Sequence, residues 1–153
     1  MKLKKANSYA LHALMYMVRH ITQSPLTLQA ISKAEGIPYR QLVSLFRLLS
    51  DAGIVQNSTS QQGGYAFARP PSDVTLLEVF ELVEGHALFQ ECFLKHTDCL
   101  GGTDNCAIYA SWKQATQMIS KKLSEISIDK AAWGHPEHFF EHCCLNNEAS
   151  EGD

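Results

Sequence analysis

The chain has 153 residues, of which 45% are hydrophobic and 19% charged, so it can bury one core and fits one domain with or without an arm. No apolar run approaches the roughly 18 residues of a membrane span, which argues against a membrane partner. The N-terminal lysines and the apolar run 11–18 only faintly resemble a signal peptide, because polar residues interrupt and close the run and no small-residue cleavage site follows. We therefore expect a cytoplasmic protein.

The net charge of −3 conceals two halves of opposite sign. Residues 1–71 carry eight Lys/Arg and two Asp/Glu, a net charge of +6, whereas residues 72–153 carry five and fourteen, a net charge of −9. A basic N-terminal half predicts a polyanionic partner there, and the acidic half argues against contact with that partner along the whole chain. Charge alone leaves chance clustering as the alternative.

The first predicted element is a helix over about residues 6–21. Its apolar residues recur at helical spacing and would face a core; they are Ala6, Ala10, Ala13, Leu14, Met17 and Ile21. A different, more polar face carries Ser8, His12, Tyr16 and Arg19.

Two further short helices follow. Thr27 can cap one over residues 28–35, which Gly36 can end. Pro38 can open the next helix, which Gly53 ends. The buried row of this third helix should be Leu42, Leu45, Phe46 and Leu49, and the opposite row Arg40, Gln41, Ser44 and Arg47.

A hairpin is predicted after the third helix. Residues 54–55 and 65–67 read as strands, and Gly63 and Gly64 allow a tight turn at the end of the polar segment 57–64. Three helices and a small β-hairpin wing make a mainly α, winged helix-turn-helix fold. The second helix of a helix-turn-helix, here the third predicted helix, enters the major groove of DNA. We therefore predict double-stranded DNA as the partner. A small helical domain with a solvated Arg/Gln face is the alternative.

The predicted DNA contacts form two groups. Base edges would be read by the start of the third helix, where Arg can bond a guanine and Gln an adenine. This group is Tyr39, Arg40, Gln41 and Ser44. Phosphates would be met by Lys2, Lys4, Lys5, Arg69 and the wing at Gly63 and Gly64. Such contacts position a protein without reading sequence.

The second half predicts two more helices, after Pro70 and Pro71. A capping-box pattern opens a helix over about 75–84, which Gly85 ends. A long helix follows over about 107–126, with an apolar stripe close to a heptad pattern: Ile108, Trp112, Ala115, Ile119, Leu123 and Ile126. Few other apolar helices remain to cover this stripe, so we predict a homodimer and a near-palindromic operator. Packing within its own domain is the alternative.

Between these helices, Cys92, Cys99 and Cys106 are separated by six residues each. Thiolates are soft ligands suited to iron–sulfur clusters and zinc. Zinc sites more often use closely spaced cysteine pairs, so the spacing favours an iron–sulfur cluster, with zinc or redox-active free thiols as alternatives. His12 is a candidate fourth ligand across a tertiary or dimer contact, or else an ordinary surface histidine.

The predicted organisation has four parts: a winged helix-turn-helix DNA-binding region (1–72), a helix and cysteine sensor loop (73–106), a dimerisation helix (107–130) and a flexible tail (131–153). The tail also contains His138, His142, Cys143 and Cys144. We favour an unstructured tail over a second metal site.

Taken together, these features resemble the Rrf2 (IscR/NsrR-type) family of winged-helix regulators over nearly all of residues 1–130. The resemblance is carried by Ser8-Tyr9-Ala10, residues 28–32, Leu45-Phe46 ahead of residues 53–55, Gly63-Gly64-Tyr65, the three cysteines and Trp112. It implies a homodimer with crossed long helices and a cluster on the three cysteines, with 2Fe–2S favoured and 4Fe–4S possible. It also implies control of genes for iron–sulfur assembly, iron supply, or nitric-oxide and redox stress, most simply as a repressor.

The chain departs from the family pattern at the ligands. Several members space the cysteines by about five residues. Some take the fourth ligand from a His three residues past the last cysteine, where this chain has Tyr109, and others from an acidic residue where it has Ser8. His12 lies one turn further along. The fourth ligand and the cluster type therefore stay open.

Two other functions compete with this one. The first is a regulator of the same fold that binds zinc or switches by thiol oxidation. The second is a cluster-carrying interaction module without DNA binding, against which the basic half and the Arg40-Gln41 pair speak. We do not expect an enzyme, because the sequence has no nucleophile–base set, phosphate loop or acid pair at informative spacing.

Overall fold

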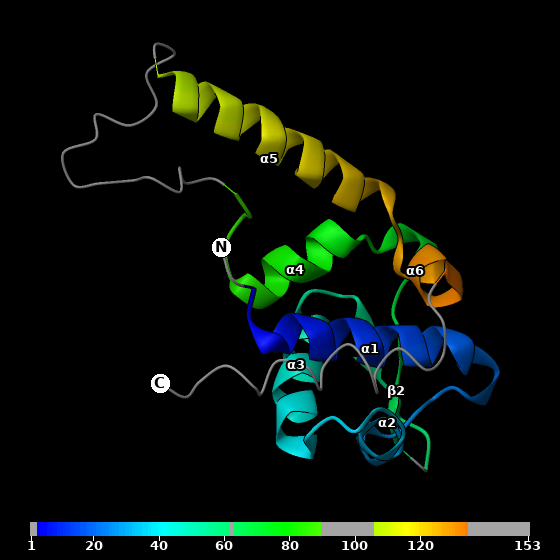
Figure 1. The fold of residues 1–153 in the computed structure, drawn as a ribbon. Helices are drawn as coiled ribbons and strands as arrows, with labels where there is room; N and C mark the ends of the chain where they lie inside the picture. Colours follow the sequence, from blue (N-terminus) through cyan, green and yellow to red (C-terminus); the bar gives the residue numbers. More distant parts are fainter. Residues whose placement is uncertain (1–2, 62, 90–105, 135–153) are drawn as a thin grey trace.

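The computed structural model describes residues 3–61, 63–89 and 106–134. In chain order its elements are α1 (Lys5–Arg19), the 3₁₀ turn η1 (Ile21–Gln23), α2 (Leu28–Glu35), α3 (Tyr39–Asp51), β1 (Val55–Asn57), β2 (Tyr65–Phe67), the 3₁₀ turn η2 (Pro71–Asp73), α4 (Leu76–Glu84), α5 (Ala107–Glu125) and α6 (Ile128–Gly134). Helix α1 is central and contacts α2, α3, α4 and α6. Helix α5 lies apart, with α4 between it and α1 (Figure 1). The predicted mainly α winged-helix fold is confirmed. Within the described residues, no helix has the length and apolar character to cross a bilayer.

Local signals fix α2 and the turn that follows it. The Thr27 hydroxyl accepts a hydrogen bond from the Ala30 backbone N–H at 3.2 Å, which caps the helix. Gly36, at φ +63°, ends it in the left-handed region. The Ser32 hydroxyl then donates to the Ile37 carbonyl at 2.6 Å. These contacts hold α2 and α3 together as a helix-turn-helix, with α2 at the predicted bounds.

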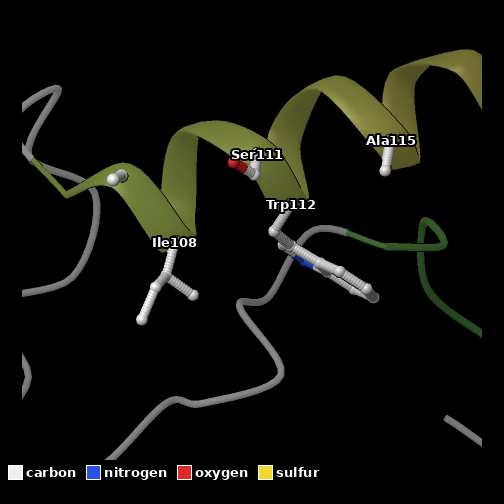
Figure 2. Close-up of a pocket in the computed structure, with 5 residues that line it drawn as sticks. Ile108, Ser111, Trp112 and Ala115 are labelled. Carbon is white, nitrogen blue, oxygen red and sulfur yellow. The ribbon is translucent and has the colours of Figure 1, made fainter.

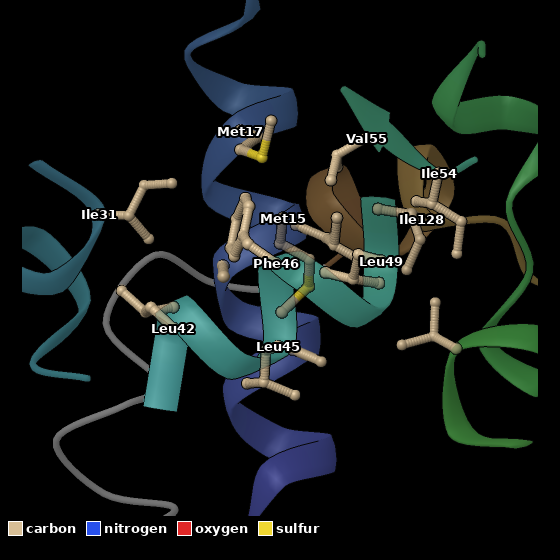
Figure 3. Close-up of a cluster of buried hydrophobic side chains, with 14 of the residues drawn as sticks. Met15, Met17, Ile31, Leu42, Leu45, Phe46, Leu49, Ile54, Val55 and Ile128 are labelled. Carbon is tan, nitrogen blue, oxygen red and sulfur yellow. The ribbon is translucent and has the colours of Figure 1, made fainter. Parts of the chain in front are cut away.

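The core lies between α1 and α3 and extends to α2, α4 and α6 (Figure 3). Its largest fully buried side chains include Phe46, Leu14, Met17, Ile31, Leu42 and Leu49. The predicted inward rows of α1 and α3 are therefore confirmed, apart from Ile21. That residue is 49% exposed because α1 ends at Arg19 and Ile21 falls in η1. The Phe46 ring meets the Tyr65 ring edge to face at 5.0 Å, which joins the core to the wing.

The wing is a two-stranded antiparallel hairpin, in which Val55 lies opposite Phe67. Strand β2 is also fixed from its other side, since Tyr65 and Leu26 exchange backbone hydrogen bonds of 2.8 and 2.9 Å. Gly64 has φ +109°, and a Cβ at this position would lie 2.8 Å from the Leu26 carbonyl oxygen. Only glycine fits there without rearrangement. The predicted hairpin is confirmed, with β1 beginning one residue later and ending two residues later than expected.

The chain just before α4 is paired with the chain just after α5. The Leu76 N–H donates to the Ile126 carbonyl at 2.9 Å, and the Ile128 N–H donates to the Val74 carbonyl at 2.8 Å. We call this pair of segments, 74–76 and 126–128, the neck. The neck brings together the two ends of the stretch of chain that contains α4, the cysteine segment and α5.

The neck is followed by α6, a helix that the sequence did not predict. The long helix predicted over about 107–126 is α5 and ends at Glu125, whereas α6 spans the end of the expected dimerisation region (107–130) and the start of the expected tail. Ile128 and Ala132 are fully buried, and the Arg19 guanidinium donates to the Ala132 carbonyl at 3.0 and 3.1 Å. Packing on α1 therefore stabilises a helix too short to be stable alone.

Candidate nucleic-acid interface and cysteine site

The outward side of α3 is a basic surface. Its exposed residues over 39–47 are Tyr39, Arg40, Gln41, Val43, Ser44 and Arg47, with no acidic side chain among them. The opposite side buries the predicted row of four apolar residues, which fixes the rotation of the helix about its axis. The Ser44 hydroxyl donates to the Arg40 carbonyl at 3.3 Å, so its oxygen remains an acceptor. All four predicted base-reading residues thus share an accessible surface.

Two residues of this surface were not among the predicted contacts. Arg47 was expected to face outward but was not assigned to DNA. Val43 was missed altogether, although it is 44% exposed. Its position on the same helical face as Tyr39 and Arg47, at i, i+4 and i+8, is the signal that could have found it.

The N-terminal lysines take different positions. The Lys4 ammonium lies 3.4 Å from a Glu84 carboxylate oxygen and donates to the Glu84 carbonyl at 3.0 Å. The Lys5 ammonium lies 5.8 Å from the centre of the Tyr9 ring, and Lys2 lies outside the described residues. Lys4 is therefore bound to the end of α4. Contact of these lysines with phosphate stays a prediction.

Arg69 is also engaged within the molecule. Its guanidinium forms an ion pair with Glu78 and donates to the Asp73 carbonyl at 3.0 Å. The Glu78 N–H donates to the Thr75 hydroxyl at 3.2 Å, so half of the predicted capping box is present. The Glu78 carboxylate contacts Arg69. A phosphate contact by Arg69 would compete with this pair.

A polar cluster joins the start of α1 to the end of α4. The Lys4 backbone N–H donates to a Glu84 carboxylate oxygen at 2.9 Å, and the amide of the buried Asn7 donates to the same oxygen. The pKa of the Glu84 carboxyl lies below its ordinary value of 4.5, chiefly because of the hydrogen bond from the Lys4 backbone N–H. Burial acts in the opposite direction and raises this pKa. Seven residues separate Glu84 from Cys92, so this cluster anchors the chain just before the cysteine segment.

Cys106 is a free cysteine at the cap position of α5. Its sulfur accepts a hydrogen bond from the Tyr109 N–H at 3.5 Å. Thiolates are soft metal ligands, and Cys106 is the one of the three predicted cysteine ligands that the structure describes. Cys92 and Cys99 lie outside the described residues. In the part of the chain that the structure describes, no group of three or more His, Cys, Asp or Glu residues could hold a metal ion.

The side chain of His12, a residue of α1, contacts the end of α2. Its Nδ1 atom is 3.5 Å from a Glu35 carboxylate oxygen, and the two side chains are 14% and 15% exposed. A carboxylate beside one ring nitrogen is common among metal-bound histidines, because it orients the ring. It also connects two helices without any metal. His138, His142, Cys143 and Cys144 lie outside the described residues.

The apolar stripe of α5 is open. Figure 2 shows Ile108, Trp112 and Ala115 projecting from the same side of the helix. They line a groove of about 460 Å³, and Ala115, Met118, Ile119, Lys122 and Leu123 line a second of about 400 Å³. Ile108 is 49%, Ile119 44% and Ile126 37% exposed. Met118, which the sequence reasoning missed, is 67% exposed.

Comparisons with known proteins agree with this geometry. A family model, Rrf2, described as iron-dependent transcriptional regulator, matches residues 3–132. The HTH-type transcriptional regulator IscR of Vibrio atlanticus is 31% identical over 128 residues, which cover 84% of this chain and 73% of that protein. Among solved structures, T. potens IscR superposes with a TM-score of 0.69 at 21% identity, covering 90% of each chain. CymR, the global cysteine regulator of B. subtilis, gives 0.72 at 17% identity, covering 89% of this chain and 99% of its own. These two structures have the same fold.

Proposed function

Because the chain belongs to the Rrf2 family of transcription regulators, we propose that it is a homodimeric DNA-binding repressor that senses redox, nitric-oxide or iron–sulfur status through an iron–sulfur cluster. The family consists of DNA-binding regulators and not of enzymes. The observation that carries the proposal is the basic outward side of α3, which the buried apolar row on the opposite side of the helix holds in place. A regulator that binds the bacterial chromosome works in the cytoplasm.

We infer that α5 pairs with α5 of a second copy. The support is the pair of apolar grooves along its open side, since an apolar surface of this kind on a helix marks an interaction site. A two-fold axis would place one copy of α3 in each of two major grooves, one helical turn of DNA apart or a multiple of it. The expected operator is therefore near-palindromic.

The proposed cluster, of the 2Fe–2S type, would be held by Cys92, Cys99 and Cys106. When bound, it supplies a redox-active centre that oxidants and nitric oxide can damage. The described part of this site is Cys106, whose sulfur accepts a hydrogen bond from the Tyr109 N–H at the start of α5. Hydrogen bonds to cluster sulfurs are one of the means by which proteins tune such centres.

We further propose that His12 of one subunit ligates the cluster of the other. The contact between His12 and Glu35 connects such a ligand to the end of α2, four residues before α3 begins. Loss of the cluster would then change how the two copies of α3 are spaced. A tenfold to hundredfold change in DNA affinity requires only about 1.4–2.8 kcal/mol of coupling.

Anaerobic purification followed by iron and sulfide analysis and visible spectroscopy tests the cluster. Cys92→Ser, Cys99→Ser and Cys106→Ser should each abolish or strongly weaken the iron content and colour, because a hydroxyl is a hard ligand. Cys143→Ser and Cys144→Ser are the matched controls and should leave both intact. A colourless zinc protein, or equal iron loss from a tail variant, would contradict the proposal.

The ligand role of His12 needs a separate measurement. His12→Ala should perturb the cluster spectrum and reduce the difference in DNA affinity between the cluster-loaded and cluster-free protein, measured without oxygen. A variant that keeps the native spectrum and the full difference would show that His12 is an ordinary helix-packing residue.

A further inference from the structure

The basic surface of α3 contains one side chain that can make no hydrogen bond. Val43 lies one turn after Tyr39 and one turn before Arg47 on the same face of the helix. It is 44% exposed, whereas its neighbour Leu42 is fully buried in the core. The apolar side chain of Val43 is therefore presented outward among cations.

Local helix stability does not explain a valine at this position. Valine is one of the poorer helix formers, because its branched Cβ loses freedom against the preceding turn. On an exposed helix face, an alanine or a long polar residue would stabilise α3 more. Single exposed apolar residues are common on protein surfaces, but this one lies within the surface that faces DNA in the proposed function.

The chemistry of the major groove specifies what Val43 can contact. The edges of the bases present hydrogen-bond donors and acceptors, and the one apolar group among them is the C5-methyl of thymine. An aliphatic side chain against a phosphate or a cytosine amino group would remove water without replacing its hydrogen bonds. Contact with a thymine methyl instead buries apolar surface on both partners.

We propose that Val43 reads one thymine methyl group in each half of the operator, beside a base pair read by Arg40. This inference rests on the proposed DNA-binding function and adds a base preference to it. The branched side chain of valine has one strongly preferred rotamer in a helix, so its methyl groups keep a fixed place relative to α3. That rigidity makes the contact selective for one position of the site.

Replacing thymine by deoxyuridine removes a single methyl group from the DNA and tests the contact directly. The operator is first obtained by selecting tight binders from random duplexes with the full-length, anaerobically purified dimer. Each thymine of the selected site is then replaced in turn. We expect one position per half-site at which the wild type loses about fourfold in affinity, the worth of one buried methyl group. Replacement in both halves should give about fifteenfold.

Val43→Ala should abolish this methyl effect at that position and at no other. The variant should fold, because alanine is the better helix former and the site is exposed. Arg40→Ala is the matched control: it should weaken binding to the selected site but keep the methyl effect.

The possible results separate the two proposals. If the selected site is bound specifically and depends on Arg40, but no thymine shows a methyl effect that Val43→Ala removes, the inference is wrong and the proposed function stands. If no sequence is bound more tightly than random DNA, the proposed function and the inference both fail.

Discussion

Replacing Ile119 by alanine should weaken self-association by about tenfold to eightyfold. Ile119 is 44% exposed in the open stripe of α5. Burial of a whole isoleucine side chain is worth about 1.5–3 kcal/mol, so covering the exposed part contributes about 0.7–1.3 kcal/mol. A two-fold interface contains the residue twice, which gives about 1.3–2.6 kcal/mol for the dimer. At about 1.4 kcal/mol for each factor of ten, this is the stated change in dissociation constant.

Sedimentation of the full-length, anaerobically purified protein over a dilution series measures this constant. Ile21→Ala is the matched control, because Ile21 is 49% exposed but lies in η1 and not on α5. The control should self-associate like the wild type. If Ile119→Ala also behaved like the wild type, or if both variants were weakened equally, α5 would not be the dimer interface.

Two predictions concern the fold itself. Gly64→Ala should destabilise the protein by about 1–3 kcal/mol through backbone strain at positive φ, and further through the close approach to Leu26. Gly63→Ala, which has open space around it, should cost less in chemical denaturation, and equal losses would contradict this reading. Glu84→Gln should lower the melting temperature at neutral pH, because the pKa of Glu84 is lowered in the fold. Because the pKa of Glu84 is lower in the folded than in the unfolded protein, the ionised carboxylate stabilises the fold at pH values above the ordinary pKa of 4.5. This stabilisation is lost as the pH falls through the pKa of the folded protein. The melting temperatures of the wild type and Glu84→Gln should therefore converge at acidic pH. A difference that stays constant at every pH would show that the contact with Lys4 stabilises the fold independently of the charge on Glu84.

The helices that could be predicted are those with local start and stop signals. Helix α2 has its predicted bounds because Thr27 caps it and Gly36 ends it, and both effects act within a few residues of sequence. Helix α6 could not be predicted in the same way. It has two fully buried apolar positions, Ile128 and Ala132, and its stability comes from α1, more than a hundred residues earlier in the chain.

The same distinction holds for the candidate site. The exposed row of α3 follows from the period of the buried row, so Arg40 and its neighbours could be predicted. The partners of Lys4 and Arg69 could not, since a count of charges does not say which of them form pairs. Glu84 meets Lys4 across 80 residues of sequence. Val43 was missed because an apolar side chain suggests the core, although its helical spacing from Tyr39 and Arg47 places it on the exposed face.

The neck has a consequence for how the part of the chain between its two segments can change. Backbone hydrogen bonds join residues 74–76 to residues 126–128 in the neck. The helix-turn-helix therefore contacts the part of the chain between these segments through α4 and the neck. The entropy of closing a flexible loop grows only with the logarithm of its length, and each doubling costs about 0.6 kcal/mol. We therefore expect the helix-turn-helix to tolerate changes in the length of the chain between α4 and α5. Evolution or a protein engineer can exchange the segment between these helices for one of different length and chemistry while leaving the DNA-reading half unaltered.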